Sequence, residues 1–182
     1  MNAGEQMNRL EIKNLTKISL CVAILCVTSY LVIPIPFSPV VIGFQTIMVN
    51  IIGLIFKPKD AGMSILIYLL MGLIGLPVFS AGASGPGKLF GPTGGFYFGF
   101  LVAVLLISLL KGKKISFVRY CIVTIVAGIP IQHAFAILFM CMHNGWNFEA
   151  AFLTVSLPFL VGDVIKCVMA STIGVALNRV LK

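Results

Sequence analysis

Six long apolar runs are the feature that most limits what this chain can fold into. They cover roughly residues 15–35, 41–56, 62–79, 93–110, 118–142 and 152–178. A helix needs about 20 largely apolar residues to cross a bilayer, and fewer where it is short or partly re-entrant. Only 10% of the residues are charged and 59% are hydrophobic, whereas about 25% are charged in a typical soluble domain. The sequence therefore predicts an all-α polytopic membrane protein with six transmembrane helices, in which residues 1–182 form a single integral membrane domain.

The positions of the basic residues predict the orientation of these helices. Eleven of the thirteen Lys and Arg residues lie in four places: the amino-terminal segment, residues 57–59, residues 111–119 and the carboxyl terminus. Because cytoplasmic segments carry an excess of Lys and Arg, we expect both termini in the cytoplasm, with residues 1–14 as a polar cytoplasmic lead. The loops 36–40, 80–92 and 143–151 then face outside and contain only Lys88. This pattern indicates a cell-membrane topology and no nucleic-acid partner.

Asp163 and Lys166 are the formal charges within the interior of the apolar runs. A charge near the bilayer centre costs roughly 2.5–3.5 kcal/mol, so such residues face protein or an aqueous cavity. At a spacing of i, i+3 the two side chains share one helix face and offset each other's cost. One interpretation is a structural ion pair that fixes helix register; the interpretation we favour is a polar site for a small ligand.

Residues 72–99 contain nine glycines and three prolines. Glycine permits positive φ values and a close approach of backbone to ligand, and irregular backbone in a membrane protein must face protein or water. We therefore predict that residues 80–92 form an extracellular lid loop, the alternative being a flexible connector. Residues 82–89 differ by one residue from the phosphate-binding GxxxxGK[ST] pattern, but Leu89 replaces the hydroxyl, and no βαβ unit surrounds it. No nucleotide site is expected.

The other chemically versatile residues do not form a recognisable site. The five cysteines lie in or beside apolar runs without CxxC spacing, which favours buried apolar roles over disulfides or metal binding. His133 and His143 are too isolated in the sequence to suggest a metal site. No nucleophile–base pair accompanies Asp163, Lys166 and Cys167, so an intramembrane enzyme is disfavoured and no cofactor or metal is expected.

Three motifs in chain order resemble the BioY family. They are Gly75-Leu-Pro-Val-Phe-Ser80, Phe90-Gly-Pro-Thr-Gly-Gly-Phe96 and Pro158-Phe-Leu-Val-Gly-Asp-Val-Ile-Lys166. Together they form the pattern GLPVF…GPTGG…PFxxGDxxK, and the resemblance covers essentially the whole chain. BioY proteins are biotin-specific S components of energy-coupling-factor (ECF) transporters. The resemblance implies high-affinity capture of biotin from outside, with a membrane-embedded T subunit and two ABC-type ATPases as partners that supply ATP-driven import.

The family's docking contact has a counterpart in the first apolar run. S components dock on the T subunit through an AxxxA step, and the equivalent here is Ser19-Leu-Cys-Val-Ala23. Small residues at this spacing let another helix pack closely. The step departs from the family pattern at Ser19 but stays small, so docking through Ser19 and Ala23 is expected.

The chemistry of biotin suggests how the site is built. Its ureido ring offers two N–H donors and one carbonyl acceptor, its thioether ring and valerate chain are apolar, and its tail ends in a carboxylate. Asp163 can accept from an N–H, and Lys166 can donate to a carbonyl or carboxylate. Gln45 either binds a ureido edge or makes a helix–helix hydrogen bond. The remaining candidate residues are expected in the walls and the lid loop: Phe79, Ser80, Ser84, Gly94, Phe96, Tyr97 and Phe159.

A second function stays open at this point. An autonomous secondary transporter would use Asp163 in proton coupling. Many such folds contain two repeated halves with paired broken helices, and no internal repeat is evident in these 182 residues. The S-component interpretation is therefore preferred.

Overall fold

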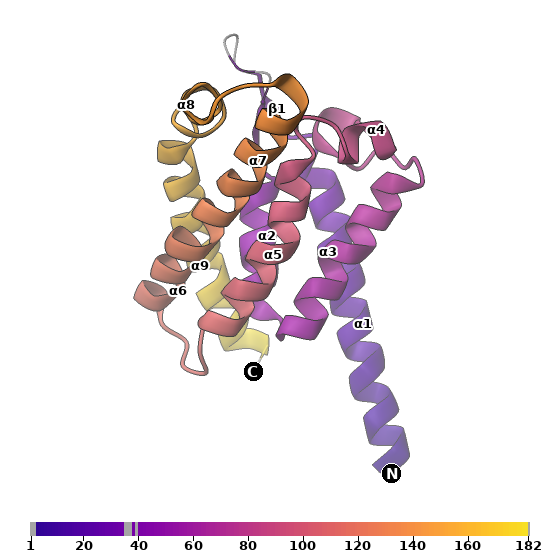
Figure 1. The fold of residues 1–182 in the computed structure, drawn as a ribbon. Helices are drawn as coiled ribbons and strands as arrows, with labels where there is room; N and C mark the ends of the chain where they lie inside the picture. The colour runs from indigo at the N-terminus through magenta and orange to yellow at the C-terminus, as the bar shows by residue number, and fades with distance from the viewer. Residues whose placement is uncertain (1–2, 35–37, 39, 182) are drawn as a thin grey trace.

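The computed structural model describes residues 3–34, 38 and 40–181 and shows an all-α bundle (Figure 1). The helices are α1 (Ala3–Thr28), α2 (Gln45–Ile55), α3 (Pro58–Leu73), α4 (Pro86–Leu89), α5 (Gly95–Leu110), α6 (Phe117–Val123), α7 (Ile129–Asn144), α8 (Phe148–Ala151) and α9 (Leu160–Leu181). A short 3₁₀ turn, η1 (Ser80–Gly82), and two π-helical segments, η2 (Thr124–Gly128) and η3 (Phe152–Ser156), complete the helical elements. α2 is central, since it packs against α1, α3, α5 and α9.

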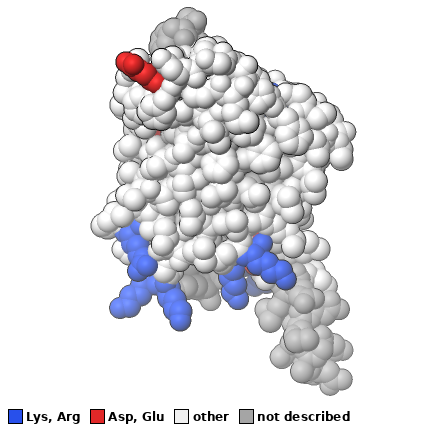
Figure 2. Space-filling model, viewed as in Figure 1, with Lys and Arg blue, Asp and Glu red and all other residues white. Residues whose placement is uncertain are grey.

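Among the described residues, two stretches of helix are long and apolar enough to cross a membrane by themselves: Phe117–Asn144, which joins α6, η2 and α7, and Leu160–Leu181. α2 and α5 are shorter apolar helices. α1 begins and α9 ends at the same end of the bundle (Figure 1), as an even number of crossings requires. Figure 2 shows Lys and Arg side chains gathered at that end on the face in view. The count of six spans itself stays a prediction.

The first apolar run is not one helix. α1 already begins at Ala3, so the described part of the predicted polar lead is helical, and it ends at Thr28 rather than near residue 35. Val32–Ile33 (β1) instead pairs with Ile42–Gly43 (β2) in an antiparallel hairpin. Hydropathy does not separate a short apolar strand from the end of a helix, which is why the prediction was wrong here. Most of the predicted outer loop 36–40 lies outside the described residues.

The second and third runs also hold less helix than expected. α2 has 11 residues, about 16 Å of helix, because the hairpin takes up the start of its run. α3 ends at Leu73, before the predicted limit at residue 79. Gly75 follows with a φ of 104°, a backbone conformation that favours glycine.

The last two runs are interrupted by π-helical segments. Pro130 lies at the start of α7 and has no N–H to donate to the preceding turn, and η2 falls immediately before it as a π bulge. The predicted span 152–178 is divided between η3, a turn at residues 157–159 and α9. Pro158 therefore lies in this turn and does not begin α9.

The α5–α7 contact positions much of the cavity described below. Gly95 and Gly99 in α5 make a small-xxx-small step that lets two helix backbones approach closely. A Cβ on Gly95 would lie 2.1 Å from the carbonyl oxygen of Phe135, and one on Gly99 would lie 2.9 Å from the Cα of Gln132. The absence of side chains at these two positions brings Gln132 and His133 up to α5.

Candidate ligand-binding site

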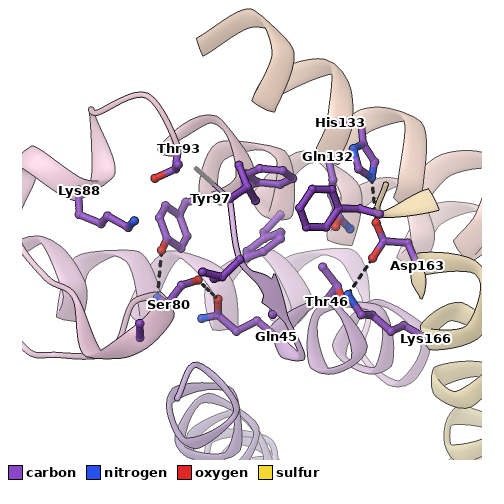
Figure 3. Close-up of a pocket in the computed structure, with 17 residues that line it drawn as sticks. Gln45, Thr46, Ser80, Lys88, Thr93, Tyr97, Gln132, His133, Asp163 and Lys166 are labelled. Carbon is purple, nitrogen blue, oxygen red and sulfur yellow. Dashed lines mark hydrogen bonds and ion pairs between the residues drawn. The ribbon is translucent and has the colours of Figure 1, made fainter. Parts of the chain in front are cut away.

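A cavity lies within the bundle beside α4 and the β1–β2 hairpin (Figure 3). These elements are at the end opposite the clustered basic residues (Figures 1 and 2). It holds about 750 Å³ of space, counting the part open to solvent. Residues from the hairpin, α2, η1, α4, α5, α7, the 157–159 turn and α9 line it. We call it the ligand cavity. Aromatic and aliphatic side chains form most of its walls, and its charged groups lie at two ends (Figure 3).

One end is an ion-pair network. Lys166 Nζ donates to Asp163 Oδ1 at 2.9 Å, which confirms the predicted i, i+3 pair. His133 Nε2 lies 2.9 Å from Asp163 Oδ2, and His133 Nδ1 lies 3.0 Å from Ser156 Oγ. An ionised carboxylate only accepts, so Nε2 carries the proton that faces Asp163, and Nδ1 is hydrogen-bonded to the Ser156 hydroxyl. The side chains are 7–13% exposed, so the pair is held almost out of solvent.

The other end carries a different kind of charge. Lys88, in α4 of the 80–92 loop, lines the cavity and extends toward its interior (Figure 3). Among the described residues it has no ion-pair partner. Burial lowers the pKa of its amine, since partial desolvation disfavours the ammonium form. Lys88 is therefore a cation at the mouth of the ligand cavity, without a counter-ion among the described residues.

A hydrogen-bonded group ties the 80–92 loop to the helices beside Lys88. Ser80 Oγ donates to Gln45 Oε1 at 2.7 Å, and Gln45 Nε2 donates to the hydroxyl of Tyr68. The Ser80 N–H donates to the hydroxyl of Tyr97 at 3.1 Å. Gln45 thus makes the helix–helix bond that was one of its two interpretations, and it also lines the cavity.

Thr46 offers an unused polar group in the ligand cavity. Its Oγ1 is buried and has no hydrogen-bond partner among the described residues. A buried hydroxyl without a partner is costly, so a ligand group that bonds Thr46 would remove that cost. The residue lies at the Asp163 end (Figure 3).

Seven of the ten residues predicted to bind ligand line the cavity. They are Gln45, Ser80, Phe96, Tyr97, Phe159, Asp163 and Lys166. Phe79 lies behind the wall: it is fully buried, and its ring centroid is 4.4 Å from that of Tyr97. Ser84 is exposed on the loop. Gly94 is buried where a Cβ would come within 1.9 Å of the Leu89 carbonyl oxygen, so it permits close loop packing. Ligand contact by these three stays a prediction that their placement does not support.

The sequence reasoning missed several cavity residues. The polar ones are Thr46, Lys88, Thr93, Gln132 and His133. His133 was considered only as a metal ligand, although an ionisable side chain inside an apolar run is itself a sign of function. Lys88 also had a usable signal, because it is the one basic residue besides Lys166 outside the four basic segments.

The predicted docking residues are both on the surface. Ser19 and Ala23 are exposed on α1, as are Leu20, Ile24 and Val27 nearby. This face of α1 is exposed among the described residues, and its small residues would let another helix pack closely. Docking itself stays a prediction.

An apolar helical bundle around an aromatic-walled cavity with charged ends defines a polytopic membrane protein built to hold a small molecule. The chain belongs to the BioY family, whose family model matches residues 4–182. It is 36% identical over 176 residues to the biotin transporter BioY2 of Lactococcus lactis subsp. cremoris, with 96% of this chain and 95% of the relative covered. It is 32% identical to the probable biotin transporter BioY of Pyrococcus horikoshii, with 91% and 96% covered.

A solved structure gives the same architecture. The crystal structure of the S-component for biotin from an ECF-type ABC transporter superposes with a TM-score of 0.89 at 26% sequence identity. The match covers 94% of each chain. The fold of this chain is therefore that of an ECF S component.

Proposed function

We propose that this protein captures biotin from the extracellular side with high affinity and delivers it into the cell as the substrate-binding subunit of an ATP-driven ECF transporter. Family membership and the biotin transporters among its relatives support this proposal. The observation that carries it is the placement of charges in the ligand cavity: a balanced ion pair at one end and an unpaired lysine at the other.

The balanced end suits the ureido ring of biotin. Each Asp163 oxygen already accepts one hydrogen bond from the protein, and a carboxylate oxygen has room for a second. A ureido N–H can therefore donate to Asp163, while Lys166 or Thr46 donates to the ureido carbonyl. These groups are neutral overall when His133 is neutral, so this end does not attract the ligand's carboxylate.

The unpaired end suits the carboxylate tail. A carboxylate beside Lys88 would form a charge-assisted hydrogen bond with its ammonium group. This bond would stabilise the charged form of the lysine, which burial disfavours. Phe96, Phe159 and Phe100 line the apolar space around the rest of the ligand. This orientation places the ring on the helices and the tail at the loop.

We further propose that residues 80–92 act as a lid. Ser80, Ala81 and Lys88 of this segment line the cavity, and positive φ values at Ala81, Gly82 and Gly85 give it several turns. Closure would exclude water and strengthen polar contacts below it. Saturating biotin should therefore protect the segment from proteases; identical protection with and without biotin would contradict the lid.

The partners follow from the S-component role. A T subunit would pack against the small-residue face of α1 at Ser19 and Ala23, and two ABC-type ATPases would supply the energy. Uptake by the protein alone in proteoliposomes, abolished by dissipating a proton gradient, would contradict this arrangement and favour a secondary transporter.

Equilibrium binding to the purified protein tests the proposed ligand and its orientation. Labelled biotin should bind, desthiobiotin should compete and lipoate should compete poorly, because lipoate lacks the ureido ring. Lys88→Met should weaken binding of biotin about tenfold, or 1.4 kcal/mol, and leave the affinity for biotin methyl ester unchanged. Lys59→Met, an exposed lysine far from the ligand cavity, is the matched control. If Lys88→Met weakened binding of biotin and of its methyl ester equally, Lys88 would not bind the carboxylate and the proposed orientation would be wrong. If the wild-type protein did not bind biotin, the proposed function would be wrong.

A further inference from the structure

A second and larger cavity lies at the end of the bundle that carries the basic residues, the end predicted to face the cytoplasm. It holds about 1070 Å³ of space, counting the part open to solvent. It is lined by parts of α1, α3, α6 and α9, by the end of α2, and by the segments between α2 and α3 and between α5 and α6. We call it the basic cavity, and neither biotin capture nor the lid uses it.

Four lysines from three parts of the chain converge on the basic cavity. Lys17 comes from α1, Lys57 precedes α3, and Lys111 and Lys113 lie in the segment that follows α5. Asp60 is the one acidic residue among the described residues that line it, so the lining has a net formal charge of +3. No ion pair joins Lys17, Lys57 or Lys111 to any described residue. Lysines that outnumber the acids around one cavity repel one another, and a bound anion would relieve that repulsion.

Lys111 shows how the cavity is held. Its Nζ donates to the carbonyl oxygen of Phe56, which also accepts from Ser108 Oγ at 2.6 Å. An ammonium has three donors, so two remain for a ligand. Burial lowers the pKa of Lys111 to about 8, because desolvation disfavours the charged form. The lysine is fixed in place before any ligand binds.

The neutral lining adds hydroxyl and amide groups and an apolar floor. Asn178 Nδ2 donates to the Leu54 carbonyl at 3.0 Å and to the Tyr120 hydroxyl at 3.1 Å. The apolar lining includes Leu54, Ile55 and Leu181. On α1, Leu20 lies one turn from Lys17 and is 61% exposed, so an apolar helix surface starts at the mouth of the basic cavity.

We propose that the basic cavity binds the phosphate of an anionic phospholipid headgroup, with the acyl chains lying along the apolar surface of α1. A ring of lysines at the cytoplasmic boundary of a bundle is the kind of site that holds such headgroups. The apolar floor and the exposed leucine beside Lys17 favour a lipid over a free anion. The lipid would join α1 to the rest of the bundle at this end. This site is independent of the proposed biotin function.

Binding of short-chain lipids to the purified protein tests the proposal. Dioctanoyl phosphatidylglycerol should bind about tenfold or more tightly than dioctanoyl phosphatidylcholine or inorganic phosphate at one fixed ionic strength. The double variant Lys17→Gln with Lys57→Gln should lose about tenfold in affinity for phosphatidylglycerol. Lys59→Gln with Lys114→Gln removes the same charge from exposed lysines that do not line the cavity, and it should bind like the wild type.

A measurement on the unmodified sequence covers the case in which a variant fails to fold. Phosphatidylglycerol should raise the pKa of Lys111, observed by NMR of dimethylated lysines, because a nearby anion favours the ammonium form. An unchanged Lys111 pKa, equal binding of phosphatidylcholine, or an equal loss in the control variant would overturn the proposal. Inorganic phosphate that binds as tightly as the lipid would overturn the lipid assignment.

Discussion

The two ends of the ligand cavity differ in how their buried charges are compensated. At one end, Asp163 is paired with Lys166 and His133, and all three side chains belong to helices. At the other end, Lys88 belongs to a short helical turn in a loop and has no described counter-ion. The charges at the first end are balanced without a ligand, whereas we propose that the carboxylate of a ligand balances the charge at the second. The Asp163 end, built on helices, is therefore suited to select a ligand ring by its shape. The Lys88 end, built on a loop, is suited to bind a negative charge.

The largest expected effect breaks the balanced end. Asp163→Asn leaves Lys166 as an unpaired buried charge, and we expect a loss of about 3–5 kcal/mol in the free energy of unfolding. Adding Lys166→Met removes that charge and should recover most of the loss. Thermal and denaturant unfolding in detergent measures both. A single variant as stable as the wild type would show that the pair does not support the fold.

The same double variant separates a structural pair from a ligand site. Asp163→Asn with Lys166→Met should bind biotin at least about tenfold more weakly than the wild type, a difference of 1.4 kcal/mol, because the ureido groups lose their partners. Titration with labelled biotin gives the ratio. If this protein folds and keeps wild-type affinity, the pair serves the fold alone.

A smaller effect concerns the orientation of Asp163. His133→Phe keeps a ring of similar size but removes the bonds to Asp163 and Ser156, and biotin affinity should fall by about three- to tenfold, or roughly 0.7–1.4 kcal/mol. His143→Phe is the control, because it lies on the same helix and is exposed. Equal effects of the two substitutions would show that His133 acts only through packing.

The smallest expected effect is a pH dependence of biotin binding that arises at the Lys88 end and not at the Asp163 end. Biotin's carboxylate is ionised above about pH 5, while the Lys88 pKa is held below the usual lysine value of about 10.5. Biotin affinity should therefore fall as pH rises through the Lys88 pKa. The unliganded fold should behave in the opposite way: its unfolded state binds the proton more tightly, so Lys88's contribution to stability rises with pH over the same range. In Lys88→Met, the pH dependence of biotin affinity and that of stability should both become weaker. A decline in affinity with pH that persists in this variant would show that another group causes it.

Sequence reasoning reached the class of protein, the paired charges and seven of the seventeen residues that line the ligand cavity, because each of these leaves a local signal. A charge within an apolar run and a glycine-rich loop are visible in a few adjacent residues. His133 meets Asp163 across 30 positions of sequence, and no local pattern reports such a contact. The β1–β2 hairpin was missed because its strands continue the apolar runs on either side. The boundaries of the helices depend on packing and on prolines whose effect falls on the preceding turn.

The π bulge before α7 has a consequence for how this protein compares with others. A π turn contains one residue more than an α turn, and residues 124–128 lie ahead of both Gln132 and His133. The bulge therefore takes up one extra residue without rotating the helix beyond it, so the loss of one residue there would leave His133 facing Asp163. The loss of one residue between 129 and 131 would instead rotate His133 away from Asp163 by about 100°. Two relatives with these two gaps would look alike in hydropathy and length, but they would present different side chains to their ligands, so the position of the gap, rather than the percentage of identity, would mark a change of specificity.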